Sequence, residues 1–269
     1  MNNLTLNTGI TIPIIGIGTN TFGKENKDFM GAINNDTSEL ESALNMGYTL
    51  IDTAIAYRNE SVVALAIKRS GLKRESLFIT SKIPGKPEYT DTDELVEKAI
   101  SSSLKELDTD YIDLYLIHHP WDDKDGIVRV WKVLERYVEK GVLKAIGVSN
   151  FNVEQLTHLL ANCSLKPAVN QIESHPGLWN DDIVDFCRIN NINVEAWSPL
   201  KRIPETSLET LKKIGLKYGK TWAQIVLRYQ IERNVIVIPK SHNKERQIEN
   251  LTIFDFSLSD EDKQLIKTL

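Results

Sequence analysis

The sequence predicts a (β/α)8 barrel, folded as one domain over residues 1–269. Short apolar runs alternate with longer segments of helical periodicity, eight times along the chain. The runs are continuously apolar, which indicates burial on both faces, as in a parallel sheet covered by helices. An open nucleotide-binding sheet fits less well, because GIGTNTFG has Gly16 and Gly18 but Thr21 where the third glycine of the fingerprint belongs. No linker-like stretch divides the chain, so we expect the units to close on themselves.

The expected strands are rich in β-branched and other apolar residues, which favour an extended, buried backbone. In chain order they are IPIIGIG (12–18), YTLIDTA (48–54), SLFITSK (76–82), YIDLYLIH (111–118), LKAIGVSN (143–150), PAVNQIE (167–173), INVEAWSP (192–199) and NVIVIPKS (234–241).

The segments between these runs carry helix signals. Gly47, Gly71 and Gly141 each stand at the end of a periodic segment, where a left-handed residue commonly stops a helix. Thr221 and Gln224 have the spacing of a capping box. The expected helical segments are 37–47, 61–71, 92–107, 128–141, 153–162, 181–190 and 221–234.

The composition indicates a globular protein that binds neither nucleic acid nor a lipid surface. The chain is 41% hydrophobic and 26% charged with a net charge of -5, which argues against a surface for nucleic acid or anionic lipid. It has neither a basic leader nor a run of about 18 apolar residues, so we expect a cytoplasmic protein outside the membrane. Cys163 and Cys187 form no CxxC pair, which predicts reduced core thiols and no cysteine metal site. We expect a monomer.

Polar side chains gather where the expected strands end. In a barrel, chemistry is located at this edge. Each residue has an ordinary alternative role, such as a turn cap, a solvated strand end or a core side chain. Their joint appearance at consecutive strand ends favours a site. The residues are Asp52, Tyr57, Lys82, His118, His119, Ser149, Asn150, Gln171, Glu173, Trp197, Ser198, Lys240 and Ser241.

Several of these segments together resemble the aldo-keto reductase superfamily, in its short-loop bacterial form. The resemblance runs through LNTGITIPIIGIGT, IDTAIAY, FITSK, YIDLYLIH, LKAIGVSNF, NQIE, AWSPL, IPKSHNKERQIENL and FDFSLSDED. It implies a barrel enzyme that reduces a small carbonyl compound with a nicotinamide cofactor. It also implies that Asp52, Tyr57, Lys82 and His118 are the catalytic tetrad.

The chemistry of these four side chains agrees with that implication. Hydride delivered to a carbonyl carbon creates an alkoxide, which requires a proton at the oxygen. We expect Tyr57 to donate it, with a pKa lowered by the Lys82 ammonium, and Asp52 to hold that ammonium in place. His118 would orient the carbonyl.

The resemblance also implies a set of cofactor contacts. Ser149, Asn150 and Gln171 would bind the nicotinamide carboxamide, and Trp197 would stack on the ring. Ser198 and Leu200 would meet the pyrophosphate. The full set is Gly18, Thr19, Ser149, Asn150, Gln171, Trp197, Ser198, Leu200, Lys240, Ser241, Arg246, Glu249 and Asn250, with the last two near the adenine.

Three residues of this set predict which nicotinamide cofactor is used. Lys240, Ser241 and Arg246 would surround one anion. Two cations and a hydroxyl suit a 2′-phosphate better than a ribose diol. We therefore expect NADPH/NADP+ as the cofactor.

The substrate pocket is expected to be open and only partly apolar. Asn20 stands where many family members have a tryptophan, and the segments after His119 and Pro199 are short. His119 and Trp121 would complete the pocket. Adjacent strand residues point to opposite faces, so His118 and His119 could both face it only if the strand has ended.

Two alternatives remain open from the sequence. One is a catalytically silent barrel that binds the nicotinamide cofactor as a regulator or sensor, since a fold does not establish catalysis. The other is a metal site on His118, His119 and His175, for which the spacing is poor and the nearby Lys82 is unfavourable. The prediction is therefore a reductase without a metal.

Overall fold

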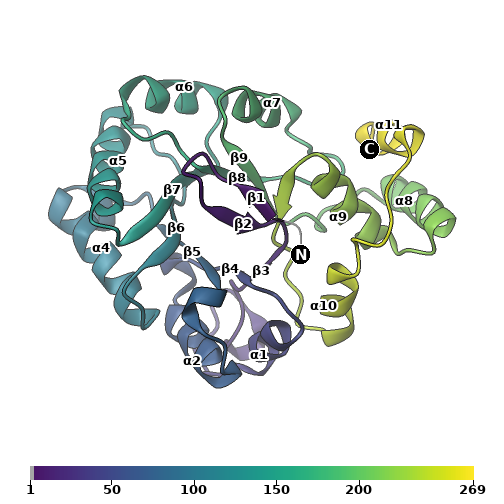
Figure 1. The fold of residues 1–269 in the computed structure, drawn as a ribbon, viewed down its shortest axis with the longest axis horizontal. Coiled ribbons are helices and arrows are strands. Elements are labelled where there is room, and N and C mark those ends of the chain that lie inside the picture. The colour runs from purple at the N-terminus through teal and green to yellow at the C-terminus, as the bar shows by residue number, and fades with distance from the viewer. Residues whose placement is uncertain (1–2) are drawn as a thin grey trace.

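The computed structural model describes residues 3–269, and a closed parallel sheet forms its centre (Figure 1). The sheet order is β10-β9-β8-β7-β6-β5-β4-β3, and every neighbouring pair is parallel. A parallel bridge between Ile15 and Val237 joins the last strand to the first. The predicted (β/α)8 barrel is therefore confirmed. Its strands are β3 (Gly16–Gly18), β4 (Leu50–Asp52), β5 (Phe78–Ile83), β6 (Ile112–Ile117), β7 (Leu143–Ser149), β8 (Val169–Glu173), β9 (Asn193–Trp197) and β10 (Val235–Val237).

Helices surround the barrel, and each segment predicted to be helical overlaps one of them (Figure 1). The predicted capping box is present at α9, where Thr221 and Gln224 exchange side-chain and backbone hydrogen bonds. The helices are α1 (Ser38–Asn45), α2 (Glu60–Ser70), α3 (Pro87–Thr90), α4 (Asp93–Glu106), α5 (Lys124–Glu139), α6 (Val153–Asn162), α7 (Asp181–Ile189), α8 (Glu205–Tyr218), α9 (Trp222–Glu232), α10 (Lys244–Leu251) and α11 (Asp260–Lys267), with 3-10 turns η1 (Glu25–Lys27), η2 (Ile55–Tyr57) and η3 (Arg74–Ser76).

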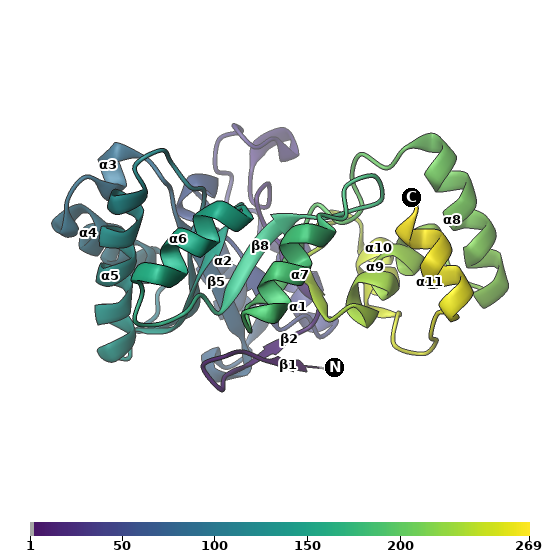
Figure 2. The same ribbon diagram turned by 90° about the horizontal axis from the view of Figure 1, so that it is seen from above.

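The first predicted strand is divided between two sheets. Its early part, β2 (Thr11–Pro13), pairs antiparallel with β1 (Asn3–Thr5), so only residues 15–18 pair within the barrel. The hairpin lies at one end of the barrel (Figure 2). Buried Leu6 and Ile12 join the cluster inside the barrel, so the hairpin closes this end.

Helix α8 was not predicted. Its sequence contains Gly215, which weakens a helical pattern. In the structure a side chain at this position would place its Cβ 2.3 Å from the Lys220 carbonyl oxygen. The glycine therefore allows the chain to turn closely into α9. Leu211 and Ile214 of α8 share a small buried cluster with α9 and α11.

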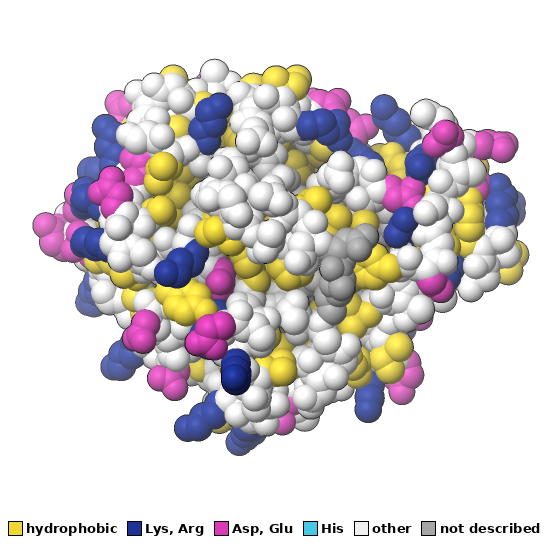
Figure 3. Space-filling model, in the orientation of Figure 1, with side chains coloured by type: hydrophobic (Ala, Val, Ile, Leu, Met, Phe, Trp, Pro, Cys, Tyr) yellow, Lys and Arg dark blue, Asp and Glu magenta, His cyan; other side chains and the backbone are white. Residues whose placement is uncertain are grey.

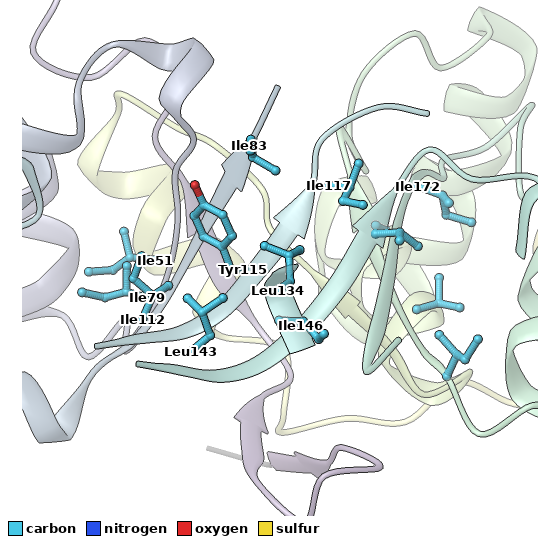
Figure 4. Close-up of a cluster of buried hydrophobic side chains, with 14 of the residues drawn as sticks. Ile51, Ile79, Ile83, Ile112, Tyr115, Ile117, Leu134, Leu143, Ile146 and Ile172 are labelled. Carbon is cyan, nitrogen blue, oxygen red and sulfur yellow. The ribbon is translucent and has the colours of Figure 1, made fainter. Parts of the chain in front are cut away.

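Two apolar layers hold the barrel together. Outward-facing side chains of neighbouring strands pack under the helices, as the isoleucines of β4 to β8 and Leu134 of α5 do in Figure 4. The inward-facing cluster includes Leu50, Leu116 and Ile236. On the face in Figure 3, charged side chains of both signs are interspersed around the rim.

Candidate active site

The period-two alternation of the strands brings the polar side chains to the open end of the barrel. Leu50 belongs to the interior cluster, so Asp52, two residues later on β4, also faces inward. The same step leads from Leu116 to His118, and from Val169 to Gln171. The apolar side chains therefore fill the barrel interior, and the polar side chains lie directly above them at its open end.

These side chains surround a cavity of about 880 Å³. Most of the residues predicted from the sequence line it, namely Gly18, Thr19, Asn20, Asp52, Tyr57, His118, His119, Ser149, Asn150, Gln171, Trp197, Ser198, Leu200 and Lys240. The predicted residues outside the lining are Lys82, Trp121, Glu173, Ser241, Arg246, Glu249 and Asn250.

Lys82 lies directly beneath the cavity wall and is fully buried. Its Nζ is 2.6 Å from Asp52 Oδ2, 2.8 Å from the Thr53 carbonyl oxygen and 3.3 Å from the Tyr57 hydroxyl. Burial is the largest influence and acts to lower the pKa of Lys82, but Asp52, Tyr57 and Glu195 together outweigh it, so the net pKa lies above the ordinary value. Lys82 is therefore an ammonium that touches both an acid and a phenol.

The predicted direction for the Tyr57 pKa was wrong. Burial raises the pKa of this phenol, and the Lys82 ammonium opposes the rise without reversing it. The contribution of Lys82 has the expected sign, but desolvation in this pocket is larger. Tyr57 consequently remains a neutral O–H donor throughout the physiological range.

His118 and His119 both face the cavity. The His118 backbone N–H still pairs with the Ile83 carbonyl oxygen of β5, so His118 follows the alternation of β6, but the strand has ended before His119 and the alternation no longer turns that side chain away. Their rings stack with centroids 4.6 Å apart, and the His118 ring meets the Tyr57 ring edge-on at 5.6 Å. Burial, assisted by the Lys82 charge, lowers the pKa of His118 to about 2. His118 is therefore a neutral imidazole that can donate one hydrogen bond.

A second buried acid, Glu195 of β9, lies near Asp52 and was missed by the sequence analysis. Gln171 Nε2 donates to Asp52 Oδ2 at 2.8 Å and also to Glu195 Oε1. Burial raises the pKa of Glu195 to about 8, and the neighbouring Asp52 charge adds to the rise. Glu195 precedes Trp197 by two residues, so strand alternation alone could have placed it in the barrel interior.

Asn150 connects the two sides of the cavity. It adopts a left-handed backbone with φ of 64°, which asparagine tolerates well. Trp197 Nε1 donates to Asn150 Oδ1 at 2.8 Å, and Asn150 Nδ2 donates to the His118 carbonyl oxygen at 3.1 Å. Asn150, predicted to bind the nicotinamide carboxamide, therefore also holds Trp197, which is predicted to stack on the nicotinamide ring.

The segment after β10 is only partly directed into the cavity. Lys240 lines it, and its Nζ donates to Thr21 Oγ1 at 2.8 Å. Ser241 exchanges hydrogen bonds with Asn243, the cap of α10, and Arg246 lies exposed in the first turn of that helix. Glu249 accepts a hydrogen bond from Thr221, and Asn250 is buried.

The outer end of the cavity contains side chains that the sequence analysis did not identify. Phe29 and Met30, on the loop between β3 and α1, line this end together with Arg58. Arg58 Nη2 donates to the Phe29 carbonyl oxygen at 2.9 Å. The available signal was an adjacent apolar pair that follows the charged stretch KENKD in this loop. Trp121 lies behind the cavity wall and packs closely on Gly85. A Cβ added at Gly85 would lie 2.8 Å from the Trp121 ring.

Two further features of the structure concern the metal-site alternative and the expected location outside the membrane. Among residues 3–269 no three His, Cys, Asp or Glu side chains come together as metal ligands. His175, the distant member of the considered metal set, contacts the Pro176 carbonyl oxygen at 2.7 Å. Within the same residues, no helix has the length and apolar character needed to cross a bilayer.

Comparison with known proteins gives consistent similarities along the chain. The sequence profile of the aldo/keto reductase family matches residues 14–269. Glyoxal reductase of Bacillus subtilis is 42% identical, covering 98% of this chain and 91% of the relative. Methylglyoxal reductase DkgA of Yersinia pestis is 35% identical, covering 97% of this chain and 90% of the relative.

Solved structures show the same similarity in three dimensions. A crystal structure of an aldo/keto reductase from Brucella melitensis has a TM-score of 0.90 and 40% identity, with 98% of each chain covered. A Bombyx mori aldo-keto reductase in complex with NADP has a TM-score of 0.86 and 35% identity, covering 98% of this chain and 91% of that chain.

Proposed function

Because the chain belongs to the aldo/keto reductase family, we propose that it reduces aldehydes or ketones to alcohols with NADPH, and that Tyr57 supplies the proton. The observation that carries this proposal is the Lys82 ammonium, which contacts both Asp52 and the Tyr57 hydroxyl beneath the cavity. When bound, the nicotinamide supplies the hydride. The complete tetrad favours a reductase over a cofactor-binding sensor, which has no use for a proton donor.

The chain's own residues can perform the proton transfer. As negative charge develops on the carbonyl oxygen, Tyr57 Oη gives up its proton to it. The Lys82 ammonium stabilises the resulting phenolate, and Asp52 keeps the ammonium in position. Neutral His118 can donate a hydrogen bond that orients the carbonyl oxygen toward Tyr57.

The residues present also fit a nicotinamide nucleotide. One wall of the cavity presents the amide of Gln171, the hydroxyl of Ser149 and the flat indole of Trp197, which suit a carboxamide and an aromatic ring. Lys201 and Lys240 line the same cavity and can neutralise phosphate charge. We assign NADP(H) as the cofactor on this fit and on family membership.

The proposed activity is tested by NADPH consumption with a panel of aldehydes, dicarbonyls and keto acids. We expect turnover with at least one carbonyl class and stoichiometric formation of the alcohol. A protein that binds NADPH but reduces no member of the panel would support the sensor alternative instead.

We predict that small polar carbonyls, such as 2-oxoaldehydes, are reduced better than bulky apolar ketones. Asn20, His119 and Arg58 make part of the cavity wall polar, and two relatives are named for glyoxal and methylglyoxal reduction. Burying a large apolar substrate against these groups would leave them without hydrogen-bond partners. Specificity constants for methylglyoxal and a steroid ketone, measured in one assay, compare the two classes, and a steroid preference would contradict the pocket argument.

We also predict that NADPH is preferred over NADH by about two orders of magnitude. Charge-assisted hydrogen bonds contribute roughly 1.5–3 kcal/mol each, so Lys240 and Arg246 could together provide this difference at a 2′-phosphate. Arg246→Ala should weaken NADPH binding and leave NADH binding unchanged. Quenching of tryptophan fluorescence gives both dissociation constants.

Lys244→Ala is the matched control for Arg246→Ala, because Lys244 is an exposed cation in the same turn of α10. It should leave the preference unchanged. If Arg246→Ala weakens both cofactors alike, Arg246 does not recognise the 2′-phosphate.

A further inference from the structure

Glu195 is a buried acid that the proposed proton transfer does not use. Its side chain is fully buried in β9, next to Gln171 in the register of β8 and β9. Among residues 3–269 no cation forms an ion pair with it, since Lys82 is engaged by Asp52. Even as a neutral carboxyl group, a fully buried polar side chain is costly unless it is hydrogen-bonded, so its presence in the barrel calls for a role.

The contacts of Gln171 indicate what that role is. Its Nε2 donates one hydrogen bond to Asp52 Oδ2 and another to Glu195 Oε1, so both amide protons are used. If the amide were turned over, its oxygen would face the Asp52 carboxylate, and two acceptors would be opposed. The two acids therefore fix the orientation of the Gln171 amide.

The consequence appears on the other side of the same amide. Gln171 lines the cavity, and among the described residues no donor reaches its Oε1. With Nε2 held by the acids behind it, the amide presents an acceptor to the cavity. A primary carboxamide supplies the matching donor through its NH2 group.

We infer that Glu195 is a positioning residue: together with Asp52 it holds the NH2 group of Gln171, so that the Gln171 carbonyl oxygen faces the cavity as acceptor for the carboxamide NH2 of the nicotinamide. This inference rests on the proposed function, which places the nicotinamide in this cavity. Glu195 acts through Gln171 and does not touch the reacting atoms.

The first test compares two substitutions of Glu195. Glu195→Leu removes the acceptor behind Gln171 at similar volume, and we expect the dissociation constant for NADPH to rise about tenfold, as for the loss of one hydrogen bond. Glu195→Gln keeps an oxygen acceptor and should stay within about twofold of the unmutated protein. Glu195→Val, which suits a strand, is measured alongside in case the leucine variant does not fold.

The second test asks whether the effect passes through Gln171. Gln171→Leu should weaken NADPH binding on its own, and adding Glu195→Leu should then cause no further loss. Additive losses in the double variant would show a general structural effect and overturn the inference. It is equally overturned if Glu195→Leu binds NADPH as tightly as the unmutated protein, or if Glu195→Gln weakens binding as much as Glu195→Leu.

These outcomes are distinct from a failure of the proposed function. If the unmutated protein binds NADPH and reduces carbonyls while Glu195→Leu binds it normally, only the role of Glu195 is rejected. If the unmutated protein does not bind NADPH, the proposed function fails, and the inference that depends on it falls as well.

Discussion

Tyr57→Phe is expected to reduce carbonyl-reducing turnover by a factor of about 10²–10⁴, the usual contribution of a general acid. The substitution removes the hydroxyl that lies 3.3 Å from Lys82 Nζ and keeps the ring that packs edge-on against His118. NADPH affinity should therefore stay within a few-fold of the unmutated protein. Steady-state kinetics with one aldehyde, together with fluorescence titration of NADPH, measure both quantities.

Tyr111→Phe controls for loss of a tyrosine hydroxyl, because Tyr111 does not line the cavity and its ring packs against Arg74. It should leave turnover unchanged. Near-normal turnover in Tyr57→Phe would show that another group, such as His118, protonates the substrate.

The proposed tetrad came from the family resemblance, but the inward direction of two of its members could be predicted from the sequence because strand alternation is a short-range rule. Asp52 follows Leu50 by two residues, and His118 follows Leu116 by two, so a correct strand assignment fixes the direction of both side chains. The barrel then brings the strand ends together without further information. The sequence could not predict the distances between the side chains. The structure gives those from Lys82 Nζ to Asp52 and to Tyr57.

Glu195 was not predicted because only side chains at the strand ends were expected to reach the site. Glu195 lies inside its strand, two residues before Trp197, where a continuous apolar pattern leads one to expect a core side chain. The sign of the Tyr57 pKa was missed for a different reason. It depends on how strongly burial opposes the Lys82 charge, and burial is a property of the packed pocket.

The outer end of the cavity could not be predicted by periodicity. Phe29 and Met30 belong to a loop with few regular elements, so no repeat in the sequence reports where their side chains point. Arg58 fixes part of this loop through the Phe29 carbonyl oxygen, a contact between residues 29 positions apart. In the proposed reductase, substrate choice would depend on such contacts, whereas the proton transfer would depend on the strand ends.

Lys82→Met is expected to have a double effect, on turnover and on stability. Turnover should fall by a factor of about 10²–10⁴, because the phenolate formed at Tyr57 loses the ammonium that stabilises it. Removing one partner of a buried ion pair typically costs about 3–5 kcal/mol of unfolding free energy, since the other charge is left without compensation. Here that charge is the Asp52 carboxylate, which is 2% exposed. Kinetics and urea unfolding measure the two effects.

The double variant Asp52→Asn with Lys82→Met separates the two effects. It removes both charges, so we expect it to regain part of the unfolding free energy lost in Lys82→Met while turnover stays low. Asparagine retains an acceptor for Gln171 Nε2, which donates to Asp52 at 2.8 Å in the unmutated protein. If the double variant is as unstable as the sum of the single variants, the uncompensated Asp52 charge is not the cause of the instability. If Lys82→Met retains turnover near the unmutated value, Lys82 has no part in the proton transfer.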